Sequence, residues 1–124
     1  MSYMLLINEP LGQRKERGLE AGQAVYERML TFTSQLQSRG ILQASNSLET
    51  LERGVRLQVR GGKRQVIDGP FTETKEMVGG FFLIDVPTRE EALAIAAECP
   101  AAEWATVEVR RVGPAADRVG QCLG

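Results

Sequence analysis

The feature that most constrains the fold is the segment from Val78 to Val86, which reads VGGFFLIDV and precedes Pro87. Its branched and aromatic residues predict a strand, and Pro87 would end it because proline has no backbone N–H to donate. Since side chains alternate along a strand, one face would carry Val78, Phe82, Ile84 and Val86, and the other Phe81 and Leu83. Both faces are therefore apolar, and we expect the sheet to be covered on both sides.

The first part of the chain predicts a strand, a helix and a second strand. Met4 to Ile7 is a short apolar run typical of a buried strand, whereas Asn8 to Gly18 is rich in glycine, proline and charge, which indicates a loop. From Glu20 to Arg39 apolar residues recur every three or four positions, which predicts an amphipathic helix. Gly40 would end that helix in the left-handed region, and Ile41 to Leu48 would continue as a strand.

In the middle of the chain the sequence predicts a β-hairpin. Val55 to Arg60 alternates apolar and polar residues, which is typical of a half-buried strand. Gly61-Gly62 is a typical two-residue turn, and Lys63 to Asp68 would return as the second strand.

After the hairpin the strand–helix–strand pattern is repeated. Thr88 and Glu91 follow the strand that ends at Val86, and their spacing is that of a capping box at the start of a helix. That helix would run to Cys99-Pro100, and Ala105 to Val112 would form the last strand. Two such units with an inserted hairpin predict an α+β, ferredoxin-like βαββαβ fold over residues 1–112, followed by a C-terminal tail, 113–124.

This fold places both helices on one face of the sheet, so the other face needs a cover. The chain has only 124 residues and no further predicted elements, so a second copy is the expected cover. We therefore expect a homodimer with Phe81 or Phe82 at the contact; the alternative is a monomer with a few exposed aliphatic side chains. Tyr26 and Trp104 are expected in the core or at an interface.

Composition and charge narrow the class of protein. Hydrophobic residues make up 43% and charged residues 25% of the chain, which is typical of one soluble domain. No segment has the pattern of a membrane span or a secretion signal, so we expect a cytoplasmic protein. The formal net charge of −1 provides no overall field for nucleic acid or anionic lipid, so direct binding to either is not expected.

The chain has no histidine, which excludes Ser-His-Asp and Cys-His catalysis and histidine-based zinc sites. Its two cysteines, Cys99 and Cys122, form no CxxC motif, and we expect free thiols rather than a disulfide. No cofactor and no transition metal are therefore expected, and only weak oxygen ligation by carboxylates stays open.

Charged residues gather just before the central strand, at Asp68, Glu73, Lys75 and Glu76. The residue types alone favour a turn in which Asp68 caps backbone donors, beside a solvated loop. Alternatively, carboxylates near one ammonium can hold a cationic or polar ligand, and Gly79-Gly80 would let a ligand or another backbone approach the strand. We therefore treat these four charged residues as the candidate ligand-binding residues and assign no catalytic residue.

The block from Asp68 to Glu76, DGPFTETKE, together with Gly79-Gly80-Phe81, resembles the DGPF group of the YCII-related family. The resemblance extends over most of residues 2–112. It implies a bacterial protein whose ferredoxin-like subunits pair into a dimeric α+β barrel, with a cleft near the DGPF segment. Some YCII-type proteins are discussed as enzymes because of a His-Asp pair, which this chain cannot form.

Two functions follow as hypotheses. The first is binding of a small polar molecule in a cleft beside the DGPF segment, with an enzymatic role left open. The second is a protein-interaction module acting with an extracytoplasmic-function sigma factor, because the family resemblance implies that partner. A deep pocket with converging charges would favour the first hypothesis, and charges that point outward would favour the second.

Overall fold

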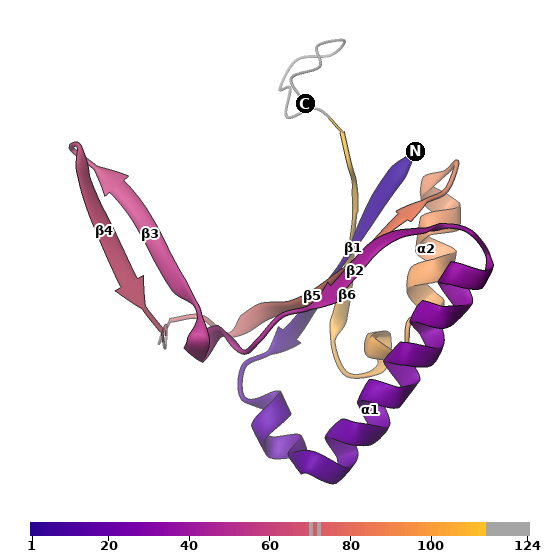
Figure 1. Cartoon of the computed structure of the whole chain (residues 1–124), viewed down its shortest axis with the longest axis horizontal. Helices are drawn as coiled ribbons and strands as arrows, with labels where there is room; N and C mark the ends of the chain where they lie inside the picture. The colour runs from indigo at the N-terminus through magenta and orange to yellow at the C-terminus, as the bar shows by residue number, and fades with distance from the viewer. Residues whose placement is uncertain (70, 72, 114–124) are drawn as a thin grey trace.

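Four strands form one antiparallel sheet in the order β2-β5-β1-β6, and two more form a separate hairpin (Figure 1). The computed structural model describes residues 1–69, 71 and 73–113. The elements are β1 (Ser2–Pro10), α1 (Gln13–Ser38), β2 (Leu42–Ser47), η1 (Leu51–Arg53), β3 (Val55–Arg60), β4 (Lys63–Asp68), β5 (Glu76–Asp85), α2 (Arg89–Glu98), η2 (Pro100–Glu103) and β6 (Thr106–Arg111).

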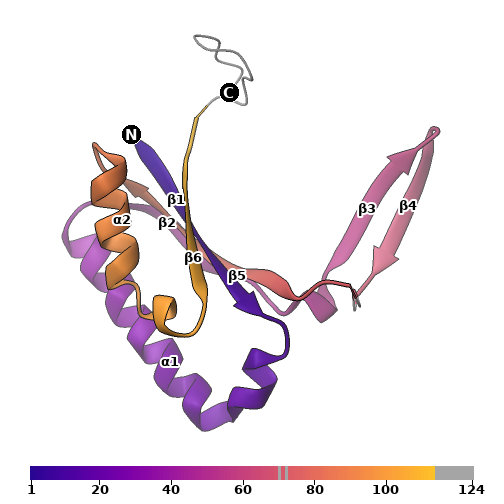
Figure 2. The same cartoon turned by 180° about the vertical axis from the view of Figure 1, so that it is seen from behind.

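Both helices cover the same face of the sheet, as the two views of the molecule show (Figures 1 and 2). The core lies between them and the sheet, and its largest fully buried side chains are those of Leu5, Leu36, Ile84 and Cys99. This arrangement confirms the predicted ferredoxin-like βαββαβ fold with an inserted hairpin. The predicted helix cap is also confirmed, because Thr88 Oγ1 accepts a hydrogen bond from the backbone N–H of Glu91 at 3.2 Å.

Helix α1 begins earlier than the sequence predicts. β1 stays paired with β5 as far as Pro10, so only two residues are left to link it to the helix, which begins at Gln13. The predicted loop from Asn8 to Gly18 is therefore wrong at both ends, because residues 8–10 belong to β1 and residues 13–17 to the helix, which leaves only the link at residues 11–12. Gly18 still interrupts the helix, because its backbone has φ 79° and ψ 176°, which are not helical values. The first helical segment thus carries residues 13–17, and the second carries the predicted apolar stripe.

A β-bulge in β5 changes which side chains share a face. Ile7 pairs with Gly80 and Asn8 pairs with Val78, so Gly79 is an extra residue without a partner in β1. Val78 therefore lies on the face opposite to Phe82, and the prediction that the two share a face is wrong. The alternation of a regular strand does not continue across an inserted residue.

Phe82 belongs to the core beneath the helices. It is 6% exposed, and its ring meets that of Phe32 edge to face, with 5.1 Å between the ring centroids. Phe82 is thus not on the helix-free face, which corrects its expected place at a dimer contact. Phe81 and Leu83 do lie on that face, where their strand neighbours in β1 are Leu6 and Met4.

The hairpin β3–β4, called the arm from here on, extends away from the rest of the molecule (Figures 1 and 2). Its turn is Gly61-Gly62, with φ values of 59° and 75°, which confirms the predicted turn. The prediction of a half-buried strand is wrong, because Leu57 is 54% and Val59 is 55% exposed. The alternation of β3 marks an apolar face that nothing in the described chain covers.

Part of the predicted organisation lies outside the described residues. The predicted tail, 113–124, lies outside them except for Gly113, and so does Cys122. Cys99 is a free, buried thiol. None of the described helices combines the length and the apolar character that a membrane crossing needs.

Candidate functional site

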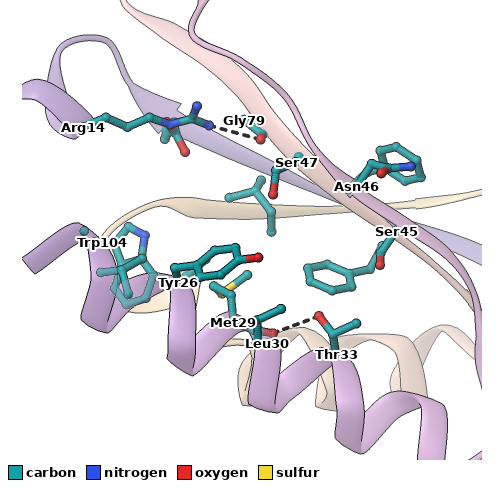
Figure 3. Close-up of a pocket in the computed structure, with 18 of the residues that line it drawn as sticks. Arg14, Tyr26, Met29, Leu30, Thr33, Ser45, Asn46, Ser47, Gly79 and Trp104 are labelled. Atoms are coloured by element: carbon teal, nitrogen blue, oxygen red, sulfur yellow. Dashed lines mark hydrogen bonds and ion pairs between the residues drawn. The ribbon is translucent and has the colours of Figure 1, made fainter. Parts of the chain in front are cut away.

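A cleft of about 520 Å³ lies between α1 and the sheet (Figure 3). Its walls are largely apolar. Helix α1 contributes Val25, Tyr26, Met29 and Leu30, and Trp104 follows the short helix η2. Tyr26 is 55% exposed, so it lies outside the core and its place at an interface stays a prediction, whereas Trp104 is partly buried and packs against the core. Apolar and aromatic walls with a few polar groups are typical of small-molecule sites.

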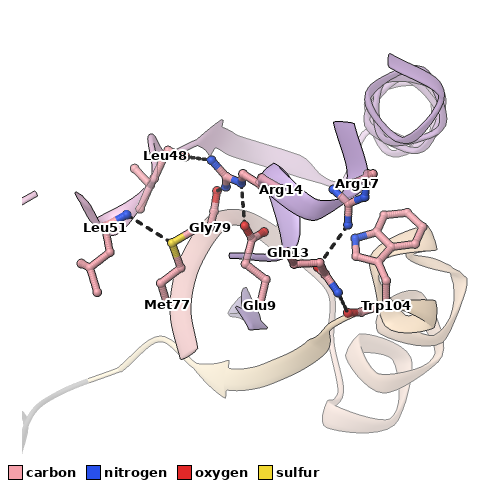
Figure 4. Close-up of polar contacts among 9 residues, drawn as sticks. All are labelled: Glu9, Gln13, Arg14, Arg17, Leu48, Leu51, Met77, Gly79 and Trp104. Atoms are coloured by element: carbon pink, nitrogen blue, oxygen red, sulfur yellow. Dashed lines mark hydrogen bonds and ion pairs between the residues drawn. The ribbon is translucent and has the colours of Figure 1, made fainter. Parts of the chain in front are cut away.

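A buried ion pair lies at one end of this cleft (Figure 4). Glu9 is 7% exposed, and its Oε1 accepts a hydrogen bond from Arg14 Nε at 2.5 Å. The same guanidinium donates from Nη1 to the carbonyl of Leu48 at 2.7 Å and from Nη2 to the carbonyl of Gly79 at 3.1 Å. Arg14 therefore ties the helix to β1, β5 and the end of β2, and its orientation is fixed by three acceptors.

The local sequence explains why the pair lies there. Glu9 continues the series of inward-facing positions in β1 formed by Tyr3, Leu5 and Ile7, so its side chain points to the helix side of the sheet. Arg14 lies on the first helical segment, which the short link after Pro10 holds close to β1. The pair is thus built from the end of one strand and the start of the next helix.

The two glycines of β5 make room for this site. A Cβ built on Gly79 would collide with the Glu9 carboxylate and lie 2.7 Å from Arg14 Nη2, and one built on Gly80 would lie 2.9 Å from the Asn46 carbonyl. The sequence predicts that Gly79-Gly80 admits a ligand or another backbone. The structure shows a packing reason, namely the close approach of β2 and of the Glu9–Arg14 pair.

A second cation lies beside the aromatic wall. The Arg17 guanidinium lies over the Trp104 ring, 5.6 Å from its centroid, and donates to Gln13 Oε1 at 3.1 Å. Gln13 in turn donates from Nε2 to the Trp104 carbonyl at 2.7 Å. These contacts hold both side chains of the cleft wall in place, so the cleft offers a positive charge next to a flat aromatic surface.

An exposed ion pair supports Trp104 from α1. Arg28 also lies over the indole, 5.4 Å from its centroid, and it pairs with Glu103. The hydrogen bond from Arg28 lowers the pKa of the Glu103 carboxyl below its usual value. Because both side chains are exposed, the pair's contribution to stability is small.

The four charged residues predicted as a ligand site do not line this cleft. Asp68 ends β4, and Glu76 begins β5 opposite Pro10. The Lys75 carbonyl accepts a hydrogen bond from the Leu11 N–H at 3.0 Å, while its side chain and that of Glu73 are exposed. The ligand-binding role of these residues stays a prediction, and two neighbours in the same motif, Pro70 and Thr72, lie outside the described residues.

Glu9 and Arg14 were not among the site residues predicted from the sequence. The available signal was the position of Glu9, a charged residue that continues the alternation of an otherwise apolar buried face. Interpreting residues 8–18 as a loop hid this alternation, because a loop residue has no assigned face. Within the described ranges, no three carboxylate or cysteine side chains converge in a way that would hold a metal ion.

Cys99 does not act as a nucleophile in this structure. It is 2% exposed, and burial raises the pKa of its thiol, which disfavours the reactive thiolate. Cys99 therefore contributes to packing rather than to a reactive site.

Comparison with known proteins gives a family and a fold. The model of the YCII-related domain matches residues 1–116. A 40-residue stretch is 50% identical to Uncharacterized protein R00369 of Rhizobium meliloti (strain 1021) and covers 32% of each chain, so the alignment spans about a third of that relative. The 5-chloro-2-hydroxyhydroquinone dehydrochlorinase TftG of Burkholderia phenoliruptrix AC1100, solved with 2,5-dihydroxybenzoquinone, has a similar fold: TM-score 0.54, 14% identity, 92% of this chain and 95% of that chain covered.

Proposed function

The chain belongs to the YCII-related family, and from this premise we propose that it binds a small planar molecule in the cleft between α1 and the sheet. The observation that carries the proposal is the buried Glu9 carboxylate, held by Arg14 at the end of an aromatic-walled cleft. Carboxylates are seldom buried, because removing their charge from water opposes folding, so a buried carboxylate beside a cleft indicates a functional role.

The arrangement of the cleft suggests the chemistry of the ligand. Arg14 Nε engages Oε1 of Glu9, which leaves Oε2 as an acceptor for a hydroxyl or N–H group of a ligand. A flat ring would pack between the Tyr26 and Trp104 side chains, and Arg17 would attract an anionic or carbonyl oxygen at the same end. We therefore propose a molecule with one aromatic or quinonoid ring that carries polar substituents.

An enzymatic role is a further part of this proposal. A carboxylate in contact with a ligand hydroxyl can accept its proton, and the nearby guanidinium groups of Arg14 and Arg17 can stabilise the resulting anion. The similar fold of TftG, whose printed ligand is a one-ring quinone, supports a ligand of that size for a cleft of about 520 Å³. At 14% identity it supports no specific reaction.

A thermal-shift screen with one-ring phenols, hydroxybenzoates and quinones tests the proposal. We expect at least one compound to raise the melting temperature of the unaltered protein, because a ligand that binds only the folded state stabilises it. Glu9→Gln should abolish that rise. Glu16→Gln is the control for the loss of a carboxylate charge, since Glu16 is exposed at the start of α1 and outside the cleft lining. If no compound shifts melting, or if both variants respond alike, the cleft is not the binding site.

The same screen tests the sequence-predicted cluster. Glu73→Gln and Lys75→Met remove charges from exposed side chains, so the folded protein should keep its stability. If these two variants lose the ligand response while Glu9→Gln keeps it, the ligand binds beside the DGPF segment instead.

We further propose a homodimer through the helix-free face, with Phe81 at the contact. Phe81, Leu83, Met4 and Leu6 are partly exposed there, on a face that no described helix covers. Such a patch favours association with a second copy. An interaction with a sigma factor stays an alternative. Sedimentation equilibrium of the protein alone separates the two, because only the homodimer needs no second protein.

A further inference from the structure

The arm has one apolar face and one polar face. In the register of β3 and β4, Leu57 lies opposite Val66, and Val55 and Val59 lie on the same side of the hairpin. These four side chains are between 54% and 58% exposed. Arg64, opposite Val59, and Asp68, opposite Val55, lie at the two ends of this face. On the other side lie Arg56, Gln58, Arg60, Lys63, Gln65 and Ile67.

The apolar face has no partner within the described chain. β3 and β4 pair with each other, and no other described helix or strand packs against either of them to a similar extent. A two-stranded hairpin is at best marginally stable alone in water, and a contiguous exposed apolar patch marks an interaction surface. The arm therefore needs a cover that this copy of the chain does not supply.

Contacts at the base of the arm fix its direction. The Arg56 guanidinium stacks on the Phe71 ring, 3.8 Å from its centroid, and donates to Thr74 Oγ1 at 3.2 Å. Beside it, the Gly69 N–H donates to the Gly54 carbonyl at 3.1 Å, and the Leu51 N–H contacts Met77 Sδ at 3.2 Å. An arm held at its base is organised before it meets a partner, which reduces the entropy lost on docking.

The arm and the rest of the chain carry opposite charge. Arg56, Arg60, Lys63 and Arg64 against Asp68 give residues 55–68 a formal charge of +3, and because the whole chain carries −1, the remainder carries −4. Two copies related by a two-fold axis would each bring an arm of net positive charge to a body of net negative charge, with Arg64 on the docking face and the other basic side chains on the opposite face. Such complementarity favours association of a chain with itself.

We propose that the apolar face of the arm docks on the body of a second copy, so that two copies exchange arms. The helix-free face of the sheet is the complementary surface, because the arm extends on the side of the sheet away from α1 (Figures 1 and 2). This inference deepens the proposed homodimer and does not depend on the ligand of the cleft. In this arrangement the arm of each copy covers the helix-free face of the other copy, with Leu57 and Val66 at the centre of the contact.

Two other partners fit the arm less well. Nucleic acid would use the basic side chains but not four exposed aliphatic ones, and residues 55–68 contain no aromatic side chain on which a base could stack. An acidic protein such as a sigma-factor segment would leave the body of a monomer with its own helix-free face uncovered. A second copy covers both surfaces.

Sedimentation equilibrium of Val66→Asp and Gln65→Asp in the full chain tests the inference. The two positions are adjacent in β4, both are exposed and both gain the same charge, but they lie on opposite faces of the arm. We expect the unaltered protein and Gln65→Asp to form dimers at low micromolar concentration. Val66→Asp should raise the dimer dissociation constant at least about tenfold, equivalent to about 1.4 kcal/mol, because a carboxylate would enter an apolar contact.

The inference is overturned if Val66→Asp and Gln65→Asp dimerise alike, or if the unaltered protein is a 13.6 kDa monomer over this concentration range. If Phe81→Ser weakens the dimer and Val66→Asp does not, the result supports a contact through the sheet and contradicts docking of the arm. Hydrogen exchange provides a measurement without any variant. Amides of β3 and β4 should exchange faster on dilution below the dissociation constant, and exchange that is independent of concentration contradicts arm docking.

Discussion

The carboxylate of Glu9 occupies the space that a side chain at position 79 would need. Gly79 lacks a Cβ, and its carbonyl accepts a hydrogen bond from Arg14, the partner of Glu9. The bulge in β5, the ion pair and the shape of the cleft end therefore depend on one another. A change at this glycine should act on stability and on ligand binding together.

Gly79→Ala should lower the free energy of unfolding by about 1–3 kcal/mol, because the added methyl group forces the Glu9 carboxylate and the Arg14 guanidinium to move. Gly22→Ala is the control, since a Cβ on Gly22 meets nothing within 4 Å. In the helix interior, that change should stabilise by about 0.5–1 kcal/mol. Urea unfolding measures both, and equal effects would contradict the close approach at Gly79.

Arg14→Lys should destabilise by about 1–3 kcal/mol, because one ammonium cannot reach all three acceptors that the guanidinium joins. Arg17→Lys, in the same helical segment, should lower stability by less than about 1 kcal/mol, since Arg17 loses one hydrogen bond and a stacking contact. Thermal and urea denaturation compare the two. A larger loss for Arg17→Lys would mean that the buried pair does not hold the helix start.

Phe81 and Phe82 should respond differently to truncation. Phe82→Ala removes a core ring packed on Phe32 and should cost about 3–5 kcal/mol of unfolding free energy. Phe81→Ser should leave the unfolding of the subunit nearly unchanged and weaken dimerisation. Circular dichroism follows the first effect, and sedimentation follows the second. If the two variants lose similar stability, the bulge does not separate the faces as described.

The Cys99 thiol should react slowly in the folded protein, and its burial should make the stability of the protein depend on pH. Burial raises its pKa in the folded state, so the corresponding stability is fully present below the ordinary thiol pKa of about 8.5 and is lost as pH rises through the raised value. In a Cys122→Ser background, alkylation of Cys99 should be slow in the native protein and fast in urea. The melting temperature should fall less between pH 8 and pH 10 when Cys99 is also replaced by alanine. Equal falls would contradict the linkage.

The sequence was sufficient to predict the fold, because its signals were local. The apolar stripe of α1, Gly40, the Gly61-Gly62 turn and the Thr88 cap each depend on neighbouring residues. The candidate site depended on contacts between distant segments. The sequence around Glu9 gives no sign that its carboxylate requires a glycine at position 79. The bulge at Gly79 also shifts the alternation in β5 from which the face of Val78 was predicted.

The charged cluster was predicted from closeness in sequence, and its ligand-binding role stays a prediction. Asp68, Glu73, Lys75 and Glu76 are close in sequence, and closeness in sequence favoured a shared site. In the structure these residues lie at strand ends and in the segment that joins the arm to the sheet, with exposed side chains. The cleft instead collects residues from β1, α1, β2, β5 and the end of η2, which no short motif contains.

The break at Gly18 divides α1 into two segments that are anchored to the sheet by different kinds of contact. Arg14 and Arg17 precede it and Tyr26, Met29 and Leu30 follow it. The hydrogen bonds of Arg14 to Glu9, Leu48 and Gly79 hold the first segment on the sheet, whereas Phe32 and Leu36 pack the second segment in the core. The charged end and the aromatic side of the cleft thus depend on different contacts, so a substitution on one side of Gly18 leaves the anchorage of the other side in place.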